Sequence, residues 1–255
     1  MTDSSEQPTG ILSVDCALLD KLVDPMGRAL WWYLASLLVM SVGSILAARH
    51  YPGGYDWLYT VASALASQKH NPDGSIWFAG ALTLSMILLW PYVSAINKLQ
   101  VPPRSLSGKF AIGALRTGLI CGAILGLERL LIHDLSAWVY KAHEILGLFT
   151  FAGLYCGIVG VLVLAMRRWK SYVLPLLLVS PLLAIAITQF WLYLAQRDLG
   201  WVDAGWRARG IPIWFSFAFW QWLAIGFLWA GLGLLSVIAM NRGSGCSKPT
   251  NKTDR

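Results

Sequence analysis

The sequence contains little charge. Of its 255 residues, 13% are Asp, Glu, Lys or Arg, where about 25% is usual for a soluble domain. By contrast, 56% are hydrophobic and the mean hydropathy is +0.57. The scarcity of charge excludes an ordinary soluble globular protein, and the apolar content excludes a disordered chain, which needs the opposite composition. An integral membrane protein remains.

Several other patterns are missing. The 24 Gly and 11 Pro show no collagen-like period, and the four Cys supply no disulfide framework. No H-E-x-x-H spacing places two metal ligands on one helical face. No basic groove or base-stacking module is visible, so we expect no nucleic-acid partner despite the net charge of +7.

Six apolar runs are each long enough to cross a bilayer, which requires roughly 20 residues of helix. They cover residues 30–48, 76–96, 110–132, 139–166, 172–195 and 213–240. These runs predict an all-α polytopic membrane protein, a bundle of six transmembrane helices with short loops. Residues 1–29 then form a leader with a short interfacial helix at 11–23, residues 30–240 form the transmembrane domain, and residues 241–255 form a basic tail.

The basic residues favour one orientation, because translocation of positive charge across the membrane is disfavoured. Twelve Lys and Arg fall on the side of the two termini, six on the other side, and two inside the third run. We therefore expect a protein of the cytoplasmic membrane with both termini cytoplasmic. Arg116, inside the third run, should face the bundle or reach the inner interface, because an arginine at mid-membrane costs roughly 2.5 to 3.5 kcal/mol. An internal partner or a lipid headgroup are the alternatives.

Small residues predict how the third and fourth runs pack. Helices in lipid associate through close backbone contact at small side chains. Gly118, Gly122 and Gly126 repeat every four residues, which places them on one helical stripe. The fourth run offers a second set at Gly153 and Gly157, with Gly160 one turn further on. The two runs should form a tightly packed antiparallel hairpin.

Residues able to carry chemistry gather on the predicted outer side. All four histidines lie there, together with Asp56, Asp73, Glu128, Asp134 and Glu144. Imidazole and carboxylate groups serve as general bases and as ligands for divalent metals. The candidate catalytic residues are His143, Glu144, Asp56 and Ser63. The candidate binding residues are Asp56, Ser63, His70, Asn71, Asp73, Glu128, Arg129, His143 and Glu144. Across the predicted hairpin, Glu144 is the expected partner of Arg129.

The first outer loop, residues 49–75, is the least generic part of the chain. It contains Tyr55-Asp56-Trp57, a Ser-x-Leu-small motif at residues 63–66, and the sequence Asn71-Pro72-Asp73-Gly74. The last of these has turn chemistry, because Pro presets φ and Asn and Asp can hydrogen-bond the nearby backbone. We expect a compact re-entrant or interfacial element followed by a turn.

These features together resemble a known family. Six runs with cytoplasmic termini, the Ser63–Ala66 motif, the Asn-Pro-x-Gly turn before the second run, and His143 near the start of the fourth look like an uncharacterised bacterial six-pass membrane protein family. That family is distantly similar to the GPI-lipid-remodelling and autophagy-modulator membrane proteins. Ala66 stands where the family pattern would have Gly. The resemblance implies the fold and a link to membrane lipids, and it implies no established activity.

The first functional hypothesis is binding or handling of a lipid or other amphiphile in a polar pocket that faces outward and is roofed by the first outer loop. One alternative is a membrane-embedded hydrolase or transferase. There, His143 or Glu144 would act as base, Asp56 or Asp73 would orient it, and Ser63 would be the nucleophile. A small-solute transporter is the other alternative, although no internal repeat supports it. Membrane lipids are the expected partners, with a second copy of the chain or another membrane protein as further candidates. No cofactor is predicted, and a divalent metal on the outer side stays an open alternative.

Overall fold

The structure is a computed structural model that describes residues 12–99, 105–132, 141–166, 173–194 and 205–244. In these ranges all the regular structure is helical, and six of the helices are long and apolar enough to cross a membrane. The six long helices are α1 (Leu12–Arg49), α3 (Ser75–Leu99), α4 (Leu106–Leu131), α5 (Ala142–Met166), α6 (Val173–Leu194) and α8 (Phe217–Ser244). The predicted class is confirmed, and the protein is a multi-pass integral membrane protein.

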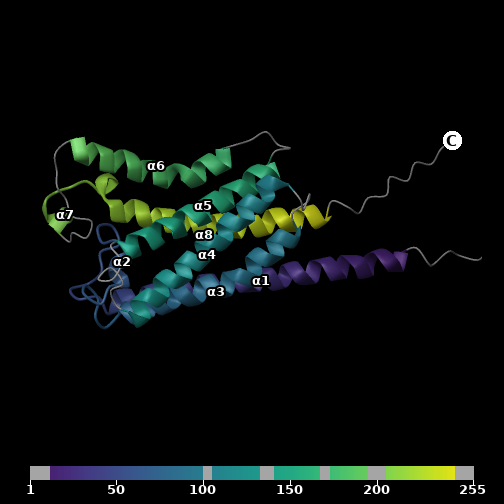
Figure 1. Ribbon diagram of the computed structural model, residues 1–255, viewed down its shortest axis with the longest axis horizontal. Helices are drawn as coiled ribbons and strands as arrows, with labels where there is room; N and C mark the ends of the chain where they lie inside the picture. The colour runs from purple at the N-terminus through teal and green to yellow at the C-terminus, as the bar shows by residue number, and fades with distance from the viewer. Residues whose placement is uncertain (1–11, 100–104, 133–140, 167–172, 195–204, 245–255) are drawn as a thin grey trace, which may run out of the picture.

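The six long helices run back and forth along the long axis of the molecule, and the short elements gather at one end of them (Figure 1). The short elements are α2 (Ala62–Leu65), α7 (Gly205–Ala208) and the 3-10 turn η2 (Ile213–Phe215). We call this the loop end. The opposite end, where α1 begins and α8 finishes, is called the termini end. Because the number of spans is even, both termini of the described chain lie on one side of the bundle.

The leader differs from the expectation of a separate interfacial helix. In the structure, α1 begins at Leu12 and continues without a break to Arg49, over 38 residues. The apolar span covers the part from Ala29 onward. A short amphipathic segment is marginal by itself, and continuing a helix that already exists adds a hydrogen bond for each residue without a new nucleation cost.

Helices α4 and α5 pack against each other more extensively than any other pair among the described helices. Their glycines make this possible. A Cβ added to Gly153 would lie 2.6 Å from the backbone N of Gly118, and one added to Gly118 would lie 2.7 Å from the backbone N of Leu154. The predicted α4–α5 hairpin is therefore confirmed. Gly126 differs, because its added Cβ would meet Ala79 and Thr83 of α3, so the α4 stripe serves two neighbours.

Polar side chains join α8 to the other helices by donating to its backbone carbonyls. The Tyr33 hydroxyl of α1 donates to Trp229 O at 2.9 Å, and the Tyr155 hydroxyl of α5 donates to Ala224 O at 3.0 Å. The fully buried Tyr92 of α3 donates to Leu232 O. Such bonds are favoured in a bundle surrounded by lipid, because water cannot solvate these hydroxyl groups there.

Helix α6 is the peripheral span. It contacts α8 and α5, and its outward side chains are highly exposed. The exposed apolar residues of α6 include Val173, Leu176, Leu177, Ile187, Phe190, Trp191 and Leu194. In a membrane these side chains face lipid, so α6 provides a surface typical of non-specific lipid contact.

The α4–α5 contact yields a test with a matched control on one helix. Gly153→Ala should destabilise the protein by about 1–3 kcal/mol, because the methyl group forces two backbones apart. Gly147→Ala should be neutral or stabilising by up to about 1 kcal/mol, since nothing lies within 4 Å of its added Cβ. Thermal unfolding of both variants in one detergent measures the difference. Equal shifts in Tm would contradict the packing described here.

Candidate functional site

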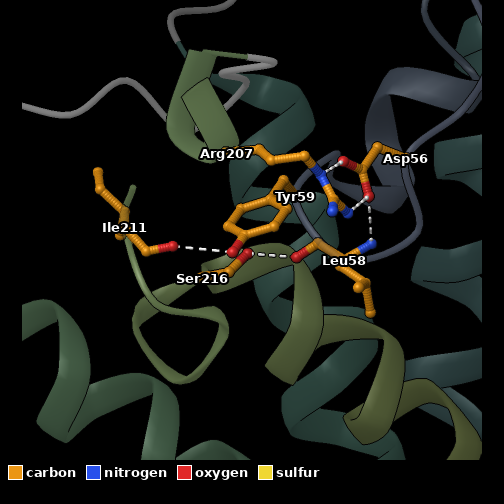
Figure 2. Close-up of polar contacts among 6 residues, drawn as sticks. All are labelled: Asp56, Leu58, Tyr59, Arg207, Ile211 and Ser216. Atoms are coloured by element: carbon orange, nitrogen blue, oxygen red, sulfur yellow. Dashed lines mark hydrogen bonds and ion pairs between the residues drawn. The ribbon is translucent and has the colours of Figure 1, made fainter. Parts of the chain in front are cut away.

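At the loop end, the first loop is joined to the segment before α8 (Figure 2). We call residues 50–74 together with residues 205–216 the cap. Arg207 of α7 holds Asp56 through two bonds: Nε to Oδ2 at 3.0 Å and Nη2 to Oδ1 at 3.2 Å. The same carboxylate accepts the backbone N–H of Leu58 at 3.1 Å. The Arg207 guanidinium also lies 5.0 Å from the centroid of the Tyr59 ring. Asp56 is thus already engaged in an ion pair with a residue 151 positions away.

Neutral hydrogen bonds extend this connection inward. The Tyr59 hydroxyl donates to Ile211 O at 2.8 Å, and the buried Ser216 hydroxyl donates to Leu58 O at 2.6 Å (Figure 2). Beneath them, the first residue of α2 is also bonded to α8, since Ala62 N donates to Gln221 Oε1 at 2.9 Å. The two segments are therefore held together by backbone carbonyls as well as by charge.

An aromatic cluster joins the cap to α8. Trp222 of α8 donates its indole N–H to the Tyr55 hydroxyl at 3.0 Å, and the Tyr55 hydroxyl donates to Thr60 O at 2.8 Å. The Trp57 ring packs edge-on against both Tyr55 and Trp222, with centroid distances of 4.9 and 4.8 Å. Burial raises the pKa of the Tyr55 hydroxyl, so this group is a neutral hydrogen-bonding element of the cap.

The charge of Asp56 is stabilised in the folded state. Partial burial by itself would raise the pKa of its carboxyl group, but the hydrogen bonds from Arg207 and Leu58 and the Arg207 charge outweigh it. The net result is a pKa below the ordinary value of 3.8. Because the Arg207 side chain is 60% exposed, solvent screens the pair and its contribution to stability is small.

Asn71 has a structural position. Its side chain is fully buried, and its amide nitrogen donates to Ala47 O at 3.0 Å and to Leu65 O at 3.2 Å. Its side-chain oxygen accepts the backbone N–H of Gly74 at 3.2 Å. The predicted turn and compact element at this place are present, and Asn71 links them to the ends of α1 and α2.

The second polar group lies where α4 ends and α5 begins, and it unites three of the candidate residues. The Arg129 Nε donates to His143 Nδ1 at 3.0 Å and lies 3.2 Å from Glu128 Oε2. His143 Nδ1 lies 3.5 Å from the same Glu128 oxygen. The Glu128 side chain is 1% exposed, and those of Arg129 and His143 are 16% and 17% exposed. We call these three residues the α4–α5 cluster.

The hydrogen-bond pattern determines the form of His143. Arginine is always protonated and can only donate, so His143 Nδ1 must supply a lone pair to Arg129. The ring proton is then on Nε2, and the imidazole is neutral. Glu128 Oε2 and His143 Nδ1 are both acceptors facing one guanidinium, which explains why the distance between them is the longest of the three.

The remaining candidates occupy separate positions. Ser63 is half-buried on α2, His70 is half-buried in the turn, Asp73 is exposed in the same turn, and Glu144 is exposed on α5. Among the residues that the structure describes, the Ser63 hydroxyl forms no hydrogen bond to an imidazole or a carboxylate. In those same ranges, no three His, Cys, Asp or Glu side chains are grouped as metal ligands. His133 and Asp134 lie outside the described residues.

Sequence reasoning missed part of both groups. It expected Glu144 as the partner of Arg129, whereas the structure places the carboxylate of the adjacent Glu128 at 3.2 Å. It also missed Arg207, Tyr59, Ser216 and Trp222, which hold the cap. Gln221 could have indicated a contact between the last span and a loop, because an amide near the start of an apolar helix requires a polar partner.

Comparison with protein-family models, with curated proteins and with solved structures found no match to this chain.

The buried amide of Asn71 can be tested against its exposed neighbour. Asn71→Asp keeps the acceptor for Gly74 but replaces a donor by a carboxylate facing two carbonyl oxygens, so it should cost about 1–3 kcal/mol or more. Asp73→Asn, two residues away and exposed, should change stability by less than about 0.5 kcal/mol. Thermal unfolding in detergent compares them. An Asn71→Asp variant as stable as wild type would contradict the hydrogen bonds to Ala47 and Leu65.

The Asp56–Arg207 pair predicts a specific pH dependence. Because the pKa of Asp56 is lowered on folding, its stabilising contribution is present above the ordinary value of 3.8 and is lost as the pH falls through the lowered value. Asp56→Asn should therefore lower Tm by at most about 3 °C at neutral pH. This difference from wild type should shrink as the pH falls below 3.8 and disappear once the pH is below the lowered pKa of Asp56. A difference that grows on acidification would show that the sign is wrong; Asp73→Asn serves as the control.

Proposed function

We propose that this membrane protein binds a lipid or other amphiphile at the α4–α5 cluster. One observation carries the proposal: the buried Glu128 and the partly buried Arg129 and His143 contact one another where two membrane-spanning helices meet. Ionisable groups in spans are costly and mark functional positions in membrane proteins more often than structural ones. Arginine and neutral imidazole both supply donors for a polar headgroup.

The surroundings of the cluster suit the apolar part of such a molecule. Leu131 follows Arg129 by two residues and is 69% exposed, and Leu148, little more than one turn beyond His143, is 67% exposed. Ile145 between them is 46% exposed. A headgroup at the cluster would leave its chain next to these side chains, so polar and apolar surfaces are adjacent as an amphiphile requires.

We also propose the cytoplasmic membrane as the location, with both termini cytoplasmic. The support is the twofold excess of Lys and Arg in the segments expected on that side. The loop end, with the cap and the α4–α5 cluster, would then face outward. Membership of the bacterial six-pass family, with its link to membrane lipids, stays a prediction that agrees with this proposal. The hydrolase, transferase and transporter alternatives stay predictions as well, because the contacts among the described residues favour none of them.

Photo-crosslinking with a diazirine-labelled phosphatidylcholine tests the binding proposal. The full chain is reconstituted in vesicles that contain the probe, and crosslinked peptides are mapped by mass spectrometry. We expect label near Leu148 that excess unlabelled phosphatidylcholine competes away. Arg129→Gln and His143→Ala should each reduce this label by about tenfold, the effect of losing one charge-assisted hydrogen bond.

Two controls make the outcome specific. The exposed face of α6 around Ile187 reports non-specific lipid contact, so its label should be unaffected by the variants. Lys98→Gln removes an exposed charge at the termini end and should leave the label near Leu148 unchanged. Equal labelling of the α5 and α6 faces, or label near Leu148 that survives Arg129→Gln, would contradict the proposal.

A further inference from the structure

Arg116 lies deep in the membrane-spanning part of α4. It is ten residues from the start of the helix at Leu106, which corresponds to about 15 Å along the axis. The α4 span covers residues Leu106–Leu131, so this arginine is close to mid-span. Arg116 is therefore not a helix-end residue whose charge bulk water solvates.

Within the described part of the chain, Arg116 has no hydrogen-bond or ion-pair partner, and its Nε is buried without one. What it does contact is an aromatic ring. The guanidinium carbon lies 5.6 Å from the centroid of the Trp90 ring on α3, a cation–π arrangement. Trp90 is itself 42% exposed, so the pair is on the lipid-facing side of the bundle, where α3 and α4 adjoin. A ring stabilises a cation without neutralising it, and the positive charge therefore persists.

The direction of the side chain indicates where an anion would come from. In a helix each Cα–Cβ bond is tilted toward the N-terminus, which for α4 is the termini end. Lys109 lies seven residues before Arg116, so it is on the same helical face and about 10 Å nearer that end. Lys109 is exposed, as is Lys98 in the last turn of α3. Two exposed lysines therefore lie between the termini end and the level of Arg116.

We propose that Arg116 and Trp90 form a binding site for the phosphate of an anionic phospholipid. The charge complementarity of Arg116, Lys109 and Lys98 selects an anionic headgroup, and the surrounding α3 and α4 surface is apolar. A lipid is the occupant because the site opens to the membrane along two apolar helices: Ile87 and Ile120, within one turn of Trp90 and Arg116, are 56% and 48% exposed. Arg116 lies 13 residues before Arg129 on α4, about 20 Å nearer the termini end. This site therefore goes beyond the proposed function and does not depend on it.

Native mass spectrometry of the full chain in detergent tests this proposal, with dioleoylphosphatidylglycerol and dioleoylphosphatidylcholine as probes. Wild type should bind the phosphatidylglycerol more tightly. Arg116→Gln should reduce this preference by about tenfold, because a charge-assisted contact is lost. Arg116→Lys should retain part of it, and Trp90→Leu should weaken it. Arg49→Gln, which removes an exposed arginine at the loop end, is the matched control and should keep the preference.

Several results would overturn the proposal. One is equal binding of the two lipids by wild type. This would mean that the Arg116 side chain reaches the membrane interface to be solvated and does not select an anionic lipid. Another is an unchanged preference in Arg116→Gln, or an equal loss in Arg49→Gln. Displacement of phosphatidylglycerol by inorganic phosphate, but not by sodium chloride at equal ionic strength, would show that a free anion occupies the site. Arg116→Gln removes a charge from a span, so it should insert normally, and a thermal unfolding measurement verifies its folding.

Discussion

The close approach of α4 and α5 is the constraint on which the rest of the structure depends. Lipid gives apolar side chains no reason to cluster, so the helices associate where their backbones can come into contact. Gly118 and Gly153 provide that contact, and neither position has room for a Cβ. The same contact brings Arg129 within 3.0 Å of His143, although the two belong to different helices. The α4–α5 cluster is therefore positioned by helix packing.

The cap shows a different way of holding segments together. At the loop end, the chain leaves its helices and exposes backbone groups that a membrane interface solvates poorly. The amide of Asn71 binds three of these groups, and the hydroxyls of Tyr59 and Ser216 bind two more. The Asp56–Arg207 pair adds charge at the exposed rim. Neutral hydrogen bonds thus hold the interior of the cap, and the ion pair lies where solvent screens it.

Two arginines on one helix have contrasting surroundings. Arg129 is within bonding distance of an imidazole and a carboxylate, so its charge is balanced inside the protein. Arg116 faces an aromatic ring, which attracts its charge but leaves it uncompensated. This difference separates the two proposals: at the loop end a balanced polar cluster adjoins apolar side chains, and toward the other end an unbalanced cation is accessible from the membrane.

The sequence by itself determined the class of protein and the number of spans. Whether an apolar segment can cross a bilayer depends on the length of that segment, which is a local property of the sequence. It also predicted the α4–α5 hairpin from its glycine spacing and the turn at residues 71–74. The tertiary structure decided which polar groups meet. Asp56 and Arg207 are 151 residues apart, and Arg129 is bonded to His143 and lies beside its neighbour Glu128. Such pairings depend on how helices rotate and pack against one another, and the rotation of a helix that is apolar on all faces is set by its neighbours.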